Sequence, residues 1–295
     1  MNIPSPLRTL GFPHRDALAR AFGPLLPVPG WTPPAMDFLF VGFTNRCGSN
    51  YLAHLLATTG AFNEAGEFFN APTVLEHAAA RGLRSLQGYF DALPALVPHT
   101  GRIAAKASID QLIMLADAGI LDALGPRVHY LLMERQDRLG QAISRVIASL
   151  TGRWTTAHWS DVPDSALVFD RVAIDTEIDK VARSNAAFYA FFAANGIVPV
   201  HTTYEAVLND AAPIMDAIGA AMTLGPLRAL PQKVAIGRQA GAVNAAWRAA
   251  YLRREETGGL PLEAELIPTA LVVDSSKKAG APPLDPAGQG PDPLN

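Results

Sequence analysis

Apolar and polar residues alternate along the chain in blocks that predict strands and helices in turn. Short apolar runs at 36–43, 102–107, 127–133 and 197–202 suit strands that are buried on both faces. Helical patterns lie at 49–59, 111–124, 137–149 and 172–195. This order predicts an α/β fold, a single domain whose central parallel sheet is flanked by helices. Ligands in such sheets bind beyond the carboxyl ends of the strands, where residues 44–50 and 135–137 fall.

The chain ends differ in composition from the middle. Prolines at 24, 27, 29, 33 and 34 interrupt helical patterns, so residues 1–35 are expected to form a disordered Pro-rich extension. Residues 275–295 are rich in proline and glycine and poor in apolar residues, which predicts a disordered tail. The α/β domain is therefore expected at 36–274. A chain of 295 residues with 49% hydrophobic residues can bury a large core.

Charge and cysteine content exclude several classes of protein. Lysine and arginine number 24 and acidic residues 27, a net charge of −3, so no positive field points to a nucleic-acid partner. One cysteine allows no intramolecular disulfide and no multi-cysteine metal site, and the seven histidines lack metal-ligand spacing. We expect no metal. With no secretory signal pattern and no run of about 18 apolar residues, a cytoplasmic protein without a membrane span is expected.

The first apolar run leads directly into a small polar turn, Thr-Asn-Arg-Cys-Gly-Ser-Asn at 44–50, followed by a helical pattern. Backbone N–H groups of the turn and the helix N-terminus would converge beside Arg46 and form an anion site. Five residues separate Gly42 from Gly48 and no lysine follows, unlike a nucleoside-triphosphate loop. Anion binding without a metal is the chemistry predicted. The alternative is an ordinary strand-to-helix turn with a strained Gly48 and an N-cap at Ser49.

Cys47 is the only thiol and lies inside this turn. The neighbouring N–H groups, the helix N-terminus and Arg46 would favour a thiolate. We therefore expect a reactive Cys47 that a bound ligand shields. The alternative is a buried thiol that resists alkylation until the protein unfolds.

Several further blocks occur in a fixed order along the chain. These are Arg46-Cys-Gly-Ser49, Glu64-Ala-Gly-Glu67-Phe68-Phe69, Arg135-Gln-Asp137 and Gln141-Ala-Ile-Ser144. Together they resemble the trehalose 2-sulfotransferase family of bacterial sulfotransferases, and the resemblance runs from about Phe38 to about Arg254. It implies a P-loop-like sulfotransferase fold and 3'-phosphoadenosine 5'-phosphosulfate (PAPS) as the sulfuryl donor.

The resemblance also implies roles for the residues of the donor site. The loop would hold the 5'-phosphosulfate through Arg46, Gly48 and Ser49, with Cys47 and Asn50 where the family has Ser and Thr. The 3'-phosphate would be held by Arg135 and Ser144. Trp154 and Arg238 match residues of later blocks of the family.

A second set of residues would act on the acceptor. The resemblance makes Glu67 the general base, while Glu64 is an alternative base or a group that orients a sugar hydroxyl. Lys106 ends a predicted strand and would neutralise charge on the leaving group, or extend its stem along apolar surface. His158 and His201 are further bases if they reach the site.

These expectations combine into one function. The protein is expected to transfer a sulfuryl group from PAPS to a hydroxyl of a carbohydrate or glycolipid-like acceptor, and the resemblance suggests a homodimer. Two alternatives stay open. One is an ATP-dependent P-loop kinase with Leu131-Leu132-Met133-Glu134 as its second motif, and the other is a non-catalytic nucleotide-binding relative.

Overall fold

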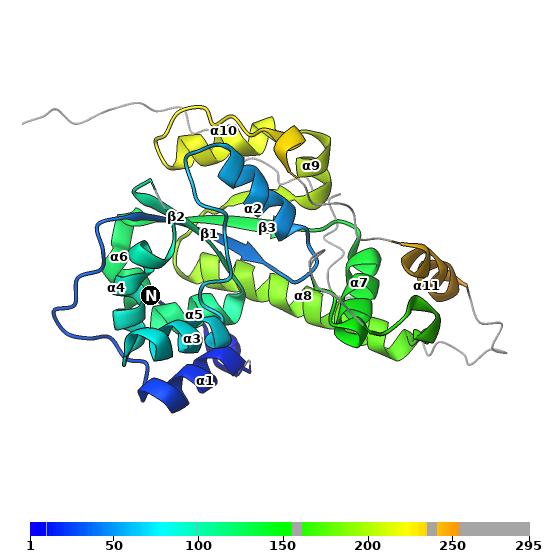
Figure 1. Ribbon diagram of the computed structural model, residues 1–295, viewed down its shortest axis with the longest axis horizontal. Coiled ribbons are helices and arrows are strands. Elements are labelled where there is room, and N and C mark those ends of the chain that lie inside the picture. The colour runs from blue at the N-terminus through cyan, green and yellow to red at the C-terminus, as the bar shows by residue number, and fades with distance from the viewer. Residues whose placement is uncertain (10, 99, 155–160, 235–240, 254–295) are drawn as a thin grey trace, which may run out of the picture. The chain divides into compact units, whose positions relative to one another are not determined.

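The computed structural model describes residues 1–9, 11–98, 100–154, 161–234 and 241–253. Its centre is a sheet whose four strands, in the order β2-β1-β3-β4, are all parallel. The strands are β1 (Asp37–Phe43), β2 (Arg102–Ala107), β3 (Val128–Glu134) and β4 (Val200–Thr203). Helices cover both faces of this sheet, as Figure 1 shows. The predicted α/β fold with a central parallel sheet is confirmed.

The helices connect the strands and extend the fold beyond them. They are α1 (Pro13–Phe22), α2 (Ser49–Thr58), α3 (Ala71–Arg81), α4 (Leu86–Leu96), α5 (Ile109–Asp117), α6 (Ile120–Leu124), α7 (Arg138–Thr151), α8 (Arg171–Ala194), α9 (Tyr204–Asn209), α10 (Ala212–Ala221) and α11 (Ala242–Leu252). Short 3₁₀ turns occur at η1 (Ser5–Thr9), η2 (Gly125–Arg127), η3 (Asp164–Ala166) and η4 (Pro231–Lys233).

The sheet separates two apolar cores because side chains alternate along each strand. Phe38 and Phe40 of β1 lie in the cluster that includes residues of α4, α5 and α8. Leu39 and Val41 point to the other cluster, with residues of α2 and α10. In Figure 1, α2 and α10 accordingly lie on one side of the sheet and α5 and α8 on the other. Both faces of β1 are thus buried, as the continuous apolar run predicted.

Strand register brings the functional loops to one edge. In β1, Gly42 pairs with Ala107 of β2 and with Leu132 of β3. The three strands therefore end within about two residues of one another in register. The segments that follow them begin at residues 44, 108 and 135 and leave the sheet at the same carboxyl edge.

The bounds of the predicted helices and strands mostly agree with the structure, but one predicted helix is divided in two. The predicted helix at 111–124 is two helices, α5 and α6, separated at Gly119. This glycine has φ +71°, a left-handed conformation that ends one helix and starts the next. A Cβ at this position would lie 2.8 Å from the Pro27 side chain, so close packing also favours glycine.

The expectation of a disordered, helix-free N-terminal extension was wrong. Residues 13–22 form α1, with Pro13 at the first turn, where the missing N–H of proline costs no hydrogen bond. Leu7, Phe12, Leu18 and Leu25 are buried in the larger core. The prolines counted as helix breakers all follow α1, so they end the helix without preventing it. The predicted tail at 275–295 lies outside the described residues.

No helix within the described ranges is both long enough and apolar enough to cross a bilayer.

Candidate active site

The loop after β1 forms a tight turn whose shape depends on Gly48. This residue has φ +95° and occupies the N-cap of α2, where it provides no side-chain cap. A Cβ here would lie 2.2 Å from the Tyr204 ring. The first N–H groups of a helix lack partners within the helix, so the start of α2, at Ser49 and Asn50, suits an anion.

Arg46 connects this loop to α7. Its Nε donates to Ser144 Oγ at 2.8 Å, and its Nη1 donates to the Trp154 carbonyl at 2.6 Å. Arg46 has φ +67°, a conformation that non-glycine residues seldom adopt and that costs on the order of 1 kcal/mol or more. Such strain concentrates at ligand sites, and here it directs a guanidinium across to α7.

Arg135 brings a second positive charge to the same place. Its Nη1 donates to the Arg46 carbonyl at 3.3 Å, and its Nη2 lies 3.5 Å from Asp137 Oδ2. Burial, and then the charge of Arg135, lower the pKa of the Arg46 guanidinium. Among the described residues, the buried Arg135 Nε has no hydrogen-bond partner. Two guanidinium groups that repel each other, with a donor atom unused, are matched to an anionic ligand.

Helix α9 completes this part of the site, and sequence reasoning missed it. Tyr204 packs its ring against the Gly48 backbone position and under the Arg135 guanidinium, 5.4 Å from the ring centre. Glu205 accepts from the backbone N–H groups of Gln136 and Asp137 at 2.9 and 3.2 Å. Both residues directly follow β4, so their position at the carboxyl end of a strand was the signal available.

Asp137 anchors the start of α7 and also balances charge. Its side chain accepts from Gly140 N at 3.0 Å as an N-cap and from Arg248 Nη1 of α11 at 2.7 Å. Burial tends to raise the pKa of Asp137, but the hydrogen bonds from Arg248 and Gly140 outweigh it, so the pKa is lowered. Arg248 was not among the residues expected at the site.

A second cluster contains Glu67 and Lys106. Lys106 Nζ donates to Glu67 Oε1 at 3.1 Å and to Asn50 Oδ1 at 2.5 Å, and it lies 5.4 Å from the Phe43 ring centre. The segment before Glu67 joins the edge of the sheet, because Gly66 bridges to Ala105 of β2. Lys106 N donates to the Gly66 carbonyl at 2.8 Å. This pairing places the carboxylate beside the ammonium at the end of β2.

Glu64 pairs with a residue outside this cluster. Its side chain is 58% exposed, and its Oε1 lies 3.3 Å from His54 Nε2. Within the described residues, the structure thus joins Glu67, Lys106 and Asn50, and pairs Glu64 with a different partner. Arg238, expected to contact the donor, and His158 lie outside the described residues.

The expectation for Cys47 was wrong. The side chain is fully buried among the residues that pack α2 against the sheet. Burial raises the pKa of the Cys47 thiol, and the opposing hydrogen bonds with Ser49 and Thr44 and the charge of Lys106 do not offset it. The turn therefore presents its backbone and Arg46 to a ligand, while its thiol fills the core.

Residues 113–255 match the model of the Stf0 sulphotransferases, and no curated protein matches the chain. The family match confirms the resemblance to the trehalose 2-sulfotransferase family. The match supports sulfotransferase activity in general terms.

Residues that match the Stf0 model form one side of the site, and residues that precede the match form the other. Arg135 and Ser144 lie within the matched residues, whereas Arg46 and Glu67 precede them. The hydrogen bond from Arg46 to Ser144 joins the two parts. The loop after β1 is therefore attached to the Stf0 segment at the residues that the sequence singled out.

Glu134, the acid of the possible kinase motif, is committed to other contacts. Its carboxylate accepts from Arg138 at 2.6 Å, from Tyr189, and from His201 Nε2 at 2.8 Å. Burial tends to raise the pKa of Glu134, but these hydrogen bonds lower it overall. His201 is likewise engaged here. No group of three or more candidate metal ligands occurs among the described residues.

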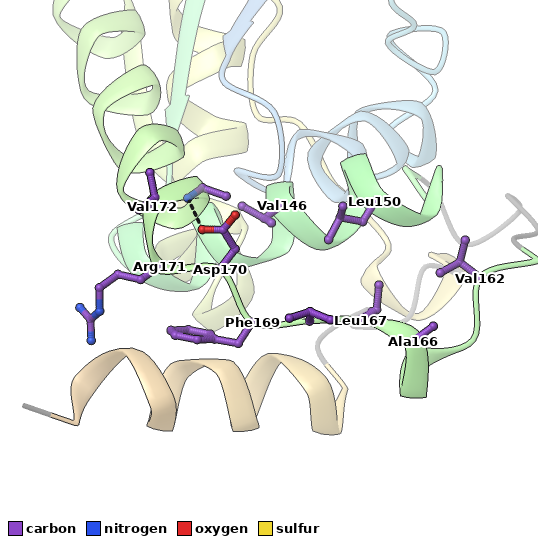
Figure 2. Close-up of a pocket in the computed structure, with 11 residues that line it drawn as sticks. Val146, Leu150, Val162, Ala166, Leu167, Phe169, Asp170, Arg171 and Val172 are labelled. Carbon is purple, nitrogen blue, oxygen red and sulfur yellow. Dashed lines mark hydrogen bonds between the residues drawn. The ribbon is translucent and has the colours of Figure 1, made fainter. Parts of the chain in front are cut away.

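A separate apolar cavity of about 670 Å³ lies between α7, the start of α8 and the connecting segment. Figure 2 shows Val146, Leu150, Leu167 and Phe169 around it, with Asp170 capping α8. None of the expected site residues that the structure describes lines it. Val146 is two residues from Ser144, about 200° around the helix, so the cavity lies on the far side of α7 from the Arg46 contact. We place the chemistry at the charged cluster, because the apolar cavity offers no comparable set of donors.

Proposed function

We propose that the protein transfers a sulfuryl group from PAPS to a hydroxyl of a carbohydrate or glycolipid-like acceptor. The observation that carries this proposal is the contact between Arg46 and Ser144, with Arg135 beside them. It creates a compact cationic site at the start of α2, next to the segment that belongs to the Stf0 sulphotransferases.

Binding of PAPS would use the residues of the loop and of α7. The 5'-phosphosulfate would lie against the N-terminus of α2, where Gly48 lets the backbone approach closely. Arg46 would help to hold this 5'-phosphosulfate, and Arg135 and Ser144 would hold the 3'-phosphate. The unused donor at Arg135 Nε and the repulsion between the two guanidinium groups both favour a multiply charged anion there.

Glu67 is the proposed general base. The acceptor oxygen attacks the sulfur atom and forms a new S–O bond while the S–O bond to the 5'-phosphate breaks. The hydroxyl proton passes to Glu67, and adenosine 3',5'-bisphosphate leaves with the bonding electron pair. Each Glu67 oxygen accepts one side-chain hydrogen bond and keeps capacity for the hydroxyl. Lys106 would stabilise the negative charge on the leaving phosphate.

The kinase alternative has less support. The loop lacks the Lys-Ser/Thr pair that contacts terminal phosphates and magnesium, and Glu134 is held by Arg138, Tyr189 and His201. The residues described here suit a metal-independent donor better.

Transfer of radiolabelled sulfuryl from PAPS to a panel of saccharides and glycolipids tests the proposal. Glu67→Gln keeps the shape of the side chain and removes the base, so turnover should fall by about 10²–10⁴ with donor affinity nearly unchanged. Glu64→Gln is the matched control and should retain activity, since Glu64 pairs with His54 at an exposed position. Loss of turnover in Glu64→Gln alone would assign the base to Glu64. Wild-type protein that binds the bisphosphate without transferring sulfuryl would favour the non-catalytic alternative.

A further inference from the structure

A chain of side-chain amides leads from the start of α5 to Glu67. Ser108 N donates to Gln111 Oε1 at 3.0 Å, and Gln111 Nε2 donates to Asn70 Oδ1 at 2.5 Å. Asn70 Nδ2 then donates to Glu67 Oε2 at 2.7 Å. Four hydrogen-bonding groups from two segments of the chain, 67–70 and 108–111, are therefore connected in series.

The two ends of this series fix its direction. A backbone N–H can only donate, so Ser108 requires the oxygen of the Gln111 amide to face it. An ionised carboxylate can only accept, so Glu67 requires the nitrogen of the Asn70 amide. Both requirements agree on the orientation of both amides. Reversal of either amide would oppose two donors or two acceptors.

The Asn70 side chain makes these contacts and does not cap the helix that it precedes. It occupies the N-cap of α3, where asparagine normally accepts from the first turn, yet its side chain makes no capping hydrogen bond. His14 Nδ1 instead accepts from Ala71 N at 3.1 Å. An N-cap hydrogen bond stabilises a helix, so its absence indicates that the Asn70 side chain serves something other than the stability of α3.

Gln111 is suited to hold Asn70 rigidly. It is 1% exposed, and its contact with Ser108 N forms part of a capping box at the start of α5. A buried amide with both ends bonded has one orientation, which it transmits to Asn70. The outcome is that Glu67 receives one donor on each oxygen, Lys106 on Oε1 and Asn70 on Oε2.

We propose that Asn70 and Gln111 are positioning residues that hold the Glu67 carboxylate for sulfuryl transfer. This inference rests on the proposed role of Glu67 as the base. With both oxygens anchored, the carboxylate plane is set before the acceptor arrives, and no reorganisation is required at the moment of proton transfer.

Asn70→Ser tests the inference. Serine is a good N-cap, so α3 should keep its stability, while the donor to Glu67 is lost. We expect kcat to fall roughly 10- to 100-fold, the equivalent of one hydrogen bond to a charged group, with KM for PAPS within about twofold. Asn70→Asp, of the same size, should lose at least as much, because a second carboxylate would face Glu67.

His14→Ala is the matched control. It removes the partner of Ala71 N at the start of the same helix without touching the amide series. It should lower the melting temperature and leave kcat near the wild-type value. If Asn70→Ser keeps wild-type kcat, or loses kcat only in proportion to a lowered melting temperature as His14→Ala does, the positioning role is wrong.

Side-chain amide NMR gives a readout that needs no turnover. The Asn70 Nδ2 resonances, assigned by their disappearance in Asn70→Ser, should shift in both Glu67→Gln and Gln111→Met. Resonances that stay in place in either variant would overturn the series even in an active enzyme. If the resonances shift but the protein does not transfer sulfuryl, the amide series is supported and the proposed function is contradicted.

Discussion

Arg46 and Ser144 lie 98 positions apart and are joined by a hydrogen bond of 2.8 Å from Nε to Oγ. The contact connects the turn before α2 with the second turn of α7. It joins the segments that follow two neighbouring parallel strands, β1 and β3. A family match limited to 113–255 would not by itself have located the loop in this site.

Ser144→Ala should weaken the binding of adenosine 3',5'-bisphosphate by roughly 0.5–1.5 kcal/mol, the usual net worth of a neutral hydrogen bond. The substitution removes the side-chain acceptor of Arg46 Nε. Ser149→Ala, at an exposed position near the end of the same helix, is the matched control and should bind normally. Equal affinities of the two variants would show that the Arg46 contact plays no part in binding.

Gly48→Ala should destabilise the protein by about 1–3 kcal/mol in denaturant unfolding, since a Cβ would collide with Tyr204 and the residue has φ +95°. Gly60→Ala separates the two causes. It also has positive φ, at +72°, but no atom lies within 4 Å of the added carbon. The loss should therefore be smaller at Gly60. Tyr204→Ala combined with Gly48→Ala should recover part of the stability, and no recovery would argue against the collision.

Cys47 should resist iodoacetamide in the native protein, with or without nucleotide, and react once the protein unfolds. The physical reason is its complete burial, which also raises the pKa of the thiol. Mass spectrometry over time gives the extent of labelling. Rapid alkylation of native protein would contradict the packing of this turn.

Glu134 makes stability depend on acidic pH. Its folded-state pKa is lowered from 4.5, so its contribution is fully present above 4.5 and is lost as the pH falls through the lowered pKa. The free energy of unfolding should decline over that interval, and Glu134→Gln should flatten the decline. A mutant with the wild-type pH dependence would assign the acid sensitivity to other carboxylates, such as Asp137 and Glu177.

The sequence predicted the sheet well, because strands buried on both faces leave continuous apolar runs. It failed at α1, where the prolines lie beyond the helix they were thought to prevent. The sequence also predicted that Arg46, Arg135 and Ser144 lie at one edge of the sheet, since Arg46 and Arg135 lie shortly after strands and Ser144 is on the second turn of the helix that follows. Tyr204, Glu205 and Asn70 escaped notice because their roles depend on contacts across the fold. The reactivity of Cys47 was misjudged for the same reason, since only the packing decides which way a turn residue points.

Calorimetric titration with adenosine 3',5'-bisphosphate in EDTA is the most direct test of the central claim. Wild-type protein should bind without metal, and Arg46→Ala and Arg135→Ala should each lose about 1.5–3 kcal/mol, the range for hydrogen bonds to charged groups. Arg183→Ala, which removes an arginine from an exposed pair with Asp179, should bind like wild type. Absence of binding in EDTA, or affinities unchanged by the loss of either arginine of the site, would contradict a PAPS site at Arg46, Arg135 and Ser144.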